Sequence, residues 1–158
     1  MDFGYAHTWS DNLLISGSIS LIRRYLNRNY KIIVVTNQSG IGRGYYDEAT
    51  FHKFMFEMRS CMQRNDADID GYYYCACDPR EKLCQYRKPN PGMIFKAALD
   101  YNISLESSLL VGDKPTDILA ANAAGVSDRY LYAPYDTPLG AELDGLRYKK
   151  VSSLDEIR

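Results

Sequence analysis

Two short apolar runs constrain the fold of this chain more than any other feature. The first covers residues 31–36 and is β-branched and apolar almost throughout, and residues 108–112 form a second run of the same character. Apolar runs of this length without alternation are typical of strands that are buried on both faces of a parallel sheet. The sequence therefore predicts at least two interior strands of an α/β fold.

The segments around these runs complete an alternating pattern of helices and strands. Four helical segments and three further strands are predicted, with helices at 19–26, 47–58, 91–99 and 113–125, and strands at 71–74, 129–132 and within 149–157. Strands separated by helices imply parallel pairing with right-handed crossovers. Because there is no linker and no repeat, we predict that residues 1–158 form one domain with a doubly wound, Rossmann-like parallel sheet.

Composition excludes several functional classes. Hydrophobic residues make up 46% and charged residues 25% of the 158 residues, which is the average for globular proteins and excludes disordered, collagen-like and coiled-coil chains. The net charge of -1 argues against a nucleic-acid partner, and no apolar run approaches the length of a membrane span. The amino terminus lacks the basic and apolar segments of a secretory signal, so we expect a cytoplasmic protein.

A polar cluster, Thr36-Asn37-Gln38-Ser39-Gly40, follows the first apolar run. Ligands of parallel sheets bind at the carboxyl ends of the strands, where such a cluster lies. A hydroxyl, two amides and the backbone N–H groups of a glycine-rich turn can together bind an anion such as phosphate. The glycine spacing does not fit a dinucleotide-binding or Walker loop. An ordinary polar turn is the alternative interpretation.

The second apolar run ends in Gly112-Asp113-Lys114-Pro115-Thr116-Asp117. We expect Asp113 at the tip of the strand and Asp117 one helical turn further along. Carboxylates placed in this way suit Mg²⁺, which prefers oxygen ligands together with waters and substrate phosphate. The alternative is that Asp113 or Thr116 only caps the following helix.

A third cluster, Arg87-Lys88-Pro89, precedes a predicted helix. Two cations beside a turn stiffened by proline can hold a phosphate, because arginine binds it with two hydrogen bonds and lysine supplies a point charge. Solvated surface charge is the alternative for a lone pair of cations.

The three clusters in this order resemble the second, third and fourth motifs of the haloacid dehalogenase superfamily of phosphatases. In finer detail, the segments 36–44 and 87–93 are similar to those of the D-glycero-D-manno-heptose-1,7-bisphosphate phosphatases, and histidinol-phosphate phosphatases have a similar loop. The resemblance extends from about Phe3 to the end of the last predicted strand. It implies a Mg²⁺-dependent phosphatase that hydrolyses a small phosphorylated sugar through an aspartyl-phosphate. We expect the chain to be a monomer.

The resemblance also implies roles for individual residues. Thr36 and Lys88 would bind the transferred phosphoryl group, and Arg87 would contact the substrate. Asp113 would hold Mg²⁺ with Lys114 beside it. The sugar-phosphate pocket would be lined by Gly4, Tyr5, Asn37, Gln38 and Ser39.

The first motif of the superfamily, Asp-x-Asp-Gly-Thr, is absent. Its two aspartates are the nucleophile and the general acid and base, and in relatives it ends the central strand just before the segment that matches residues 2–5. We therefore expect the chain to lack that strand and to be inactive as it stands. Either the start was assigned to an internal methionine, which we favour, or the chain is a truncated remnant that binds a phosphorylated sugar or a partner without catalysis.

A cysteine-rich segment departs from the family in a second way. The heptose enzymes carry Cys-x-His and Cys-x-Cys there and bind a structural Zn²⁺, whereas this chain has Cys75, Cys77, Cys84 and Tyr86. Three thiolates and a tyrosine are not a usual tetrahedral set, and Asp78 or a water would have to complete it. Structural Zn²⁺ and three thiols without a metal both stay open.

Overall fold

The computed structural model describes residues 7–80, 84–135 and 141–158. The chain divides into two compact units, Met1–Lys82 and Leu83–Arg158, and each is described by itself. Within the described segments, no helix is both long enough and apolar enough to cross a membrane.

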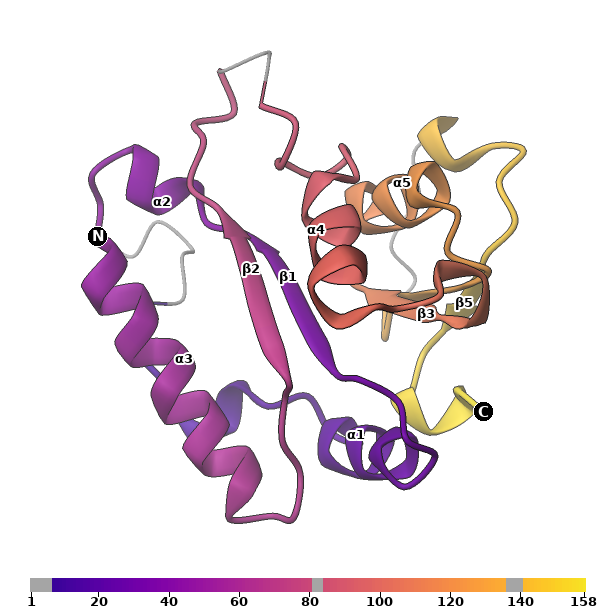
Figure 1. Ribbon diagram of the computed structural model, residues 1–158, viewed down its shortest axis with the longest axis horizontal. Coiled ribbons are helices and arrows are strands. Elements are labelled where there is room, and N and C mark those ends of the chain that lie inside the picture. The colour runs from indigo at the N-terminus through magenta and orange to yellow at the C-terminus, as the bar shows by residue number, and fades with distance from the viewer. Residues whose placement is uncertain (1–6, 81–83, 136–140) are drawn as a thin grey trace. The chain divides into compact units, whose positions relative to one another are not determined.

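Among its described residues, the first unit has two parallel strands and three α-helices, whose arrangement can be followed in Figure 1. In chain order its elements are η1 (Asp11–Leu13), α1 (Ser18–Leu26), β1 (Ile33–Asn37), α2 (Ser39–Gly42), α3 (Glu48–Gln63) and β2 (Gly71–Cys75). Ile33 lies opposite Gly71 and Asn37 lies opposite Cys75, so the two strands begin and end level with each other. The polar cluster after β1 and the cysteine segment after β2 therefore leave the sheet at the same edge.

The core of this unit forms between α3 and the strands. Phe51 and Met55 of α3 are buried, and Tyr72 and Tyr74 of β2 pack against their cluster. The two tyrosines are two residues apart and so lie on the same face of the strand. Asp47 is the N-cap residue of α3, and its carboxylate accepts a hydrogen bond of 2.8 Å from the backbone N–H of Thr50.

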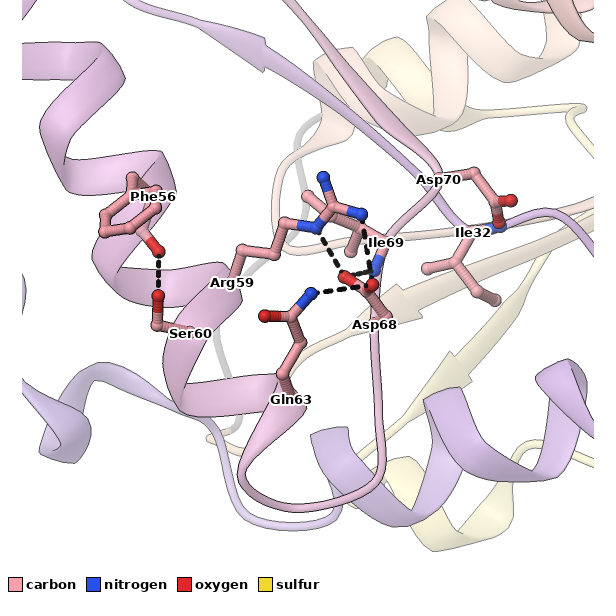
Figure 2. Close-up of polar contacts among 8 residues, drawn as sticks. All are labelled: Ile32, Phe56, Arg59, Ser60, Gln63, Asp68, Ile69 and Asp70. Atoms are coloured by element: carbon pink, nitrogen blue, oxygen red, sulfur yellow. Dashed lines mark hydrogen bonds and ion pairs between the residues drawn. The ribbon is translucent and has the colours of Figure 1, made fainter.

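Polar contacts join the end of α3 to the segment before β2 (Figure 2). The Asp68 carboxylate accepts hydrogen bonds from Arg59 Nε at 2.6 Å, Arg59 Nη2 at 3.0 Å and Gln63 Nε2 at 3.0 Å. Chiefly because of the hydrogen bonds from Arg59, the pKa of Asp68 is lowered to about 2. Nearby, Asp70 accepts the backbone N–H of Ile32 at 2.8 Å. These contacts connect α3 and the segment before β1 to the segment before β2, at the amino-terminal edge of the sheet.

The second unit is built on three parallel strands in the order β3-β4-β5. Its elements are α4 (Gly92–Tyr101), η2 (Leu105–Ser107), β3 (Leu109–Gly112), α5 (Pro115–Ala124), β4 (Asp128–Tyr132), η3 (Ala141–Leu143), β5 (Lys149–Val151) and η4 (Leu154–Glu156). Helix α5 contacts β3, β4 and α4 (Figure 1). Its residue Ile118 is fully buried and shares a core cluster with Leu131 of β4.

The structure confirms the α/β class and the parallel pairing. Strand β1 pairs with β2, and β3 pairs with β4; among the described residues no strand pairs with the other edge of β1 or of β3. That this chain lacks the central strand of the fold stays a prediction. One local prediction is wrong, because the glycine-rich loop after β1 contains the short helix α2.

Candidate functional site

The turn at the carboxyl end of β1 is held by side-chain hydrogen bonds. Gln38 donates from Nε2 to Thr36 Oγ1 at 3.1 Å, and Tyr46 donates its hydroxyl proton to Gln38 Oε1. The backbone N–H of Gln38 donates to the carbonyl of Cys75 at 2.8 Å. The polar cluster is therefore a constrained turn in which the position of Thr36 is fixed through Gln38.

Two glycines allow α2 to pack closely on its neighbours. A Cβ atom on Gly40 would lie 2.3 Å from a ring carbon of Tyr46, and one on Gly42 would lie 2.2 Å from the carbonyl oxygen of Ala76. Contacts this short exclude any side chain unless the backbone moves. The absence of a side chain at these two positions therefore allows the turn to pack in close contact with Tyr46 and with the segment after β2.

Asp78 lies on the cysteine segment and is engaged by two arginines. Its carboxylate accepts hydrogen bonds from Arg80 Nε and Nη2, both at 2.9 Å, and lies 3.3 Å from Arg43 Nε. These contacts, led by the side-chain hydrogen bonds from Arg80, hold the pKa of Asp78 well below its usual range. With both oxygens engaged by arginines, Asp78 is a poor candidate for a zinc ligand, which favours a water as the fourth ligand if a zinc ion is held.

In the second unit, a buried ion pair joins two of the predicted site residues. Lys88 Nζ lies 2.6 Å from Asp117 Oδ1, and the two side chains are only 12% and 7% exposed. Asp117 Oδ2 accepts the backbone N–H of Lys114 at 3.0 Å. A Cβ atom on Gly112 would lie 2.3 Å from the Cβ of Asp117, so the glycine that ends β3 makes room for this carboxylate.

These contacts decide between the interpretations given to both clusters. Lys88 is not solvated surface charge, because its ammonium group is paired and mostly buried. The alternative interpretation, in which Asp113 or Thr116 only caps α5, does not agree with the structure. Lys114 is the N-cap residue, and the carboxylate that accepts its N–H belongs to Asp117.

Asp113 differs from Asp117 in its surroundings. It directly follows β3 and is exposed, and the described part of the chain gives its carboxylate no hydrogen bond or ion pair. An open carboxylate at the carboxyl end of a strand fits Mg²⁺, which keeps several waters and takes one or two protein carboxylates. Both oxygens of Asp117 already have partners, so of the two carboxylates Asp113 fits the metal better.

The turn that carries Lys88 is fixed by its own backbone. Asn90 donates its backbone N–H to the carbonyl of Arg87 at 2.8 Å and its side-chain amide to the carbonyl of Cys84 at 2.9 Å. A Cβ on Gly92 would lie 2.5 Å from the carbonyl oxygen of Gln85. Arg87 is half-buried on this turn, directly before the lysine.

The remaining predicted site residues are distributed over both units. Gly4 and Tyr5 lie outside the described residues. Cys75 and Cys77 belong to the first unit, and Cys84 to the second. The residue that sequence reasoning missed is Tyr46: it sits in a pair of tyrosines between the glycines and α3, and no pattern in the sequence distinguishes its hydroxyl from that of Tyr45.

One stretch of the chain, Asp68-Ile69-Asp70-Gly71, has the spacing Asp-x-Asp-Gly. It precedes β2 instead of following a strand, and Figure 2 shows Asp68 bonded to Arg59 at the end of α3. Asp70 is bonded to Lys31 and Ile32, which lie just before β1. These carboxylates lie at the amino-terminal edge of the sheet and cannot serve as the nucleophile of a site at its carboxyl edge.

Comparison with known proteins gives one family model that matches part of the chain. This model, described as HAD-hydrolase-like, matches residues 85–128. The matched segment carries Arg87, Lys88, Asp113 and Asp117, and therefore includes the buried ion pair and the open carboxylate.

Two relatives match most of the chain. The D-glycero-alpha-D-manno-heptose-1,7-bisphosphate 7-phosphatase of Burkholderia mallei is 40% identical over 141 residues, which are 85% of this chain and 75% of the relative. The D-glycero-beta-D-manno-heptose-1,7-bisphosphate 7-phosphatase of Salmonella typhi is 35% identical over 163 aligned positions, covering 99% of this chain and 86% of the relative. The similarity thus includes both units.

A solved structure has a similar fold. The D,D-heptose 1,7-bisphosphate phosphatase of B. bronchiseptica, crystallised with magnesium and phosphate, superimposes with a TM-score of 0.71 and 25% sequence identity. The match covers 88% of this chain and 78% of the other.

Proposed function

This chain belongs to the family of D-glycero-D-manno-heptose-1,7-bisphosphate 7-phosphatases, and from that premise we propose that its site serves to remove the C7 phosphate of a heptose bisphosphate. The observation that carries the proposal is the buried Lys88–Asp117 pair beside the open carboxylate of Asp113. A cation held in a site of low exposure and a carboxylate left free for a metal are what the transfer of a charged phosphoryl group requires.

The roles proposed for Thr36, Lys88 and Arg87 follow from the family to which the chain belongs. Thr36 supplies a hydroxyl donor and Lys88 a positive charge for the phosphoryl oxygens, while Arg87 binds the substrate. From the same family resemblance, Asn37 and Ser39 would line the sugar-phosphate pocket. Because the charge on the phosphoryl oxygens shifts during transfer, donors that are fixed before the reaction stabilise the transition state more than mobile ones.

Magnesium belongs to the proposal through Asp113, with Lys114 as its neighbour. The ion supplies charge neutralisation to the phosphoryl oxygens when it is bound. A magnesium role for Asp117 stays a prediction. Its contacts give it a second role, which is to hold Lys88 in place and to compensate its charge.

The nucleophile is not among the 158 residues, which contain no Asp-x-Asp-Gly-Thr. We therefore propose that turnover needs this motif on a strand upstream of the segment at residues 2–5. The test compares phosphate release from heptose 1,7-bisphosphate by the present chain and by a form extended with an apolar strand that ends in the motif. We expect no release from the first and Mg²⁺-dependent release from the second. A folded, extended form without activity would refute the enzymatic proposal.

The missing motif also favours a second candidate, a protein that binds a phosphorylated sugar without hydrolysing it. Both candidates predict that heptose bisphosphate with Mg²⁺ raises the melting temperature of the present chain. Only the binding protein predicts that the extended form binds the sugar phosphate equally well and releases no phosphate. Histidinol phosphate, included in the same assays, identifies the related activity if it is preferred over the sugar.

Zinc, location and assembly complete the proposal. Structural Zn²⁺ would be held by Cys75, Cys77 and Cys84, whose sulfur atoms lie within 4.8 Å of one another. Cys77 and Cys84 are disulfide-bonded in this structure, so zinc binding requires that this bond be reduced. Metal analysis of reduced protein purified without chelator tests the site, and well under one equivalent of zinc would count against it. A monomer in the cytoplasm is proposed from the sequence alone, and sedimentation tests the assembly.

A further inference from the structure

The ring of Tyr46 is buried beside the turn that ends β1. The residue is 8% exposed and belongs to the core cluster that contains Phe51 and Met55. The ring of His7 stacks on that of Tyr46 with centroids 5.6 Å apart and planes inclined by 16°. Gly40 leaves the space in which the ring lies. The hydroxyl of Tyr46 is therefore held in a fixed position next to Gln38.

Gln38 is constrained through its backbone and through both ends of its amide. Its N–H donates to the Cys75 carbonyl at 2.8 Å. Its Oε1 accepts from the Tyr46 hydroxyl, and its Nε2 donates to Thr36 Oγ1 at 3.1 Å. A carboxamide accepts only through oxygen and donates only through nitrogen. When Tyr46 donates to the oxygen, the amide must present its NH₂ group to Thr36.

The direction of the bond between Gln38 and Thr36 determines what the hydroxyl can offer a ligand. A threonine hydroxyl has one hydrogen and two acceptor positions. Because Thr36 Oγ1 accepts from Gln38, its hydrogen can be donated to an anion. A phosphoryl oxygen accepts such a hydrogen bond, and charge makes the bond stronger than a neutral one. If the amide were reversed, it would take the hydrogen of Thr36, and the phosphoryl group would face only lone pairs.

We infer that Tyr46 is a positioning residue of this site: through the amide of Gln38 it directs the hydroxyl hydrogen of Thr36 toward the phosphoryl group. The inference rests on the proposed function, in which Thr36 binds that group. It also gives Gln38 a role different from that of Asn37 and Ser39. The amide of Gln38 hydrogen-bonds to Tyr46 and Thr36 and so does not bind the sugar.

The first test follows the Gln38 side-chain amide by NMR in the 158-residue chain. We expect two resolved, slowly exchanging Nε2 protons, which average or exchange rapidly in Tyr46→Phe. Tyr72→Phe is the matched control, because the Tyr72 hydroxyl bonds to His52 Nδ1 at 2.8 Å and its ring packs on the same core cluster. Gln38 signals that are the same in Tyr46→Phe as in the unaltered chain would overturn the inference.

The second test is a double-mutant cycle on the affinity for inorganic phosphate, followed by ³¹P NMR. We expect Thr36→Val to weaken binding at least about tenfold and Tyr46→Phe about threefold to tenfold, since each removes or misdirects one hydrogen bond to a charged ligand. In the Thr36→Val background, Tyr46→Phe should have no further effect, whereas Thr36→Ser should keep the dependence on Tyr46. Equal losses in both backgrounds would show a merely structural role and overturn the inference.

The two tests separate a failure of the inference from a failure of the proposed function. Phosphate binding that is insensitive to Tyr46→Phe overturns the inference and leaves the proposed function standing. A restrained Gln38 amide in a chain that binds no phosphate overturns the phosphoryl role of Thr36, and the inference falls with it.

Discussion

The ammonium group of Lys88 and the carboxylate of Asp117 lie 2.6 Å apart, and neither side chain is more than about one-eighth exposed. Removing one partner of a buried pair leaves the other charge without compensation, which is more costly than losing an exposed pair. The pair therefore has two effects: it stabilises the second unit, and it holds in place the Lys88 ammonium group that we propose binds the phosphoryl group.

The first prediction concerns this pair. Asp117→Asn should lower the free energy of unfolding by about 3 kcal/mol, because the buried ammonium group of Lys88 loses the negative charge that lies 2.6 Å from it. Asp100→Asn is the matched control, since the Lys96–Asp100 pair has the same chemistry at 2.9 Å with side chains 50% and 37% exposed. It should cost less than about 0.5 kcal/mol. Urea denaturation measures both, and equal costs would contradict the assignment of a buried, compensated lysine.

The second prediction concerns the glycine at the end of β3. Gly112→Ala would place a Cβ 2.3 Å from the Cβ of Asp117, so the carboxylate or the strand must shift. We expect a loss of about 1–3 kcal/mol in unfolding free energy, as in other overpacked interiors. Combining Gly112→Ala with Asp117→Asn should cost less than the sum of the two single changes, because both disturb the same pair. Full additivity would show that the glycine serves another purpose.

The third prediction is a dependence of stability on pH through Asp68. The pKa of this carboxyl is about 2 in the folded chain, against an ordinary value of 3.8. A lowered folded pKa adds stability that is complete above about pH 4 and is lost as the pH falls toward 2. Because Asp68 and Arg59 are 37% and 47% exposed, solvent screening limits the effect to about 1 kcal/mol.

Asp68→Asn should therefore destabilise the chain at pH 6, and the difference from the unaltered chain should shrink as the pH falls toward 2. Asp66→Asn is the control, because the Asp66 side chain is exposed and makes no hydrogen bond within the described segments. Thermal unfolding of the three proteins between pH 2 and 6 checks the prediction, which fails if the two variants behave alike.

The fourth prediction concerns metal binding at Asp113. Mn²⁺, used as a paramagnetic substitute for Mg²⁺, should broaden the amide signals of residues 112–114 in NMR spectra of the chain. Asp113→Asn should abolish the broadening because it removes the open carboxylate. Asp100→Asn, which alters a carboxylate on α4, should leave the broadening unchanged. Broadening that persists in Asp113→Asn would place the metal elsewhere.

The regular elements of both units could be predicted because their sequence patterns are local. The strand predicted at residues 71–74 is β2, Gly71–Cys75, because its three consecutive tyrosines have a high local preference for strands. Asp47 as the N-cap of α3 is equally local, because the cap and the N–H that it binds are three residues apart.

What the sequence could not predict depends on contacts between distant residues. Helix α2 has four residues, two of them glycine, and its place is set by Tyr46 and the Ala76 carbonyl rather than by helix propensity. The same holds for the site: the sequence indicated Lys88 and Asp117 separately, but only the fold makes them partners. Tyr46 was not predicted at all, because its role depends on the path of the turn around Gly40.

The close approach of Gly42 to the Ala76 carbonyl implies that the cysteine segment supports the turn after β1. Gln38 donates its N–H to the Cys75 carbonyl, and the Arg43 side chain pairs with that of Asp78. The turn after β1 therefore contacts the end of β2 and the segment that follows it at three places. A change in the rigidity of the stretch from Cys75 to Asp78 will therefore alter the position of the Thr36 hydroxyl. If a substitution in this stretch weakens phosphate binding, the first explanation to consider is a displaced turn after β1, even when the altered residue does not contact the substrate.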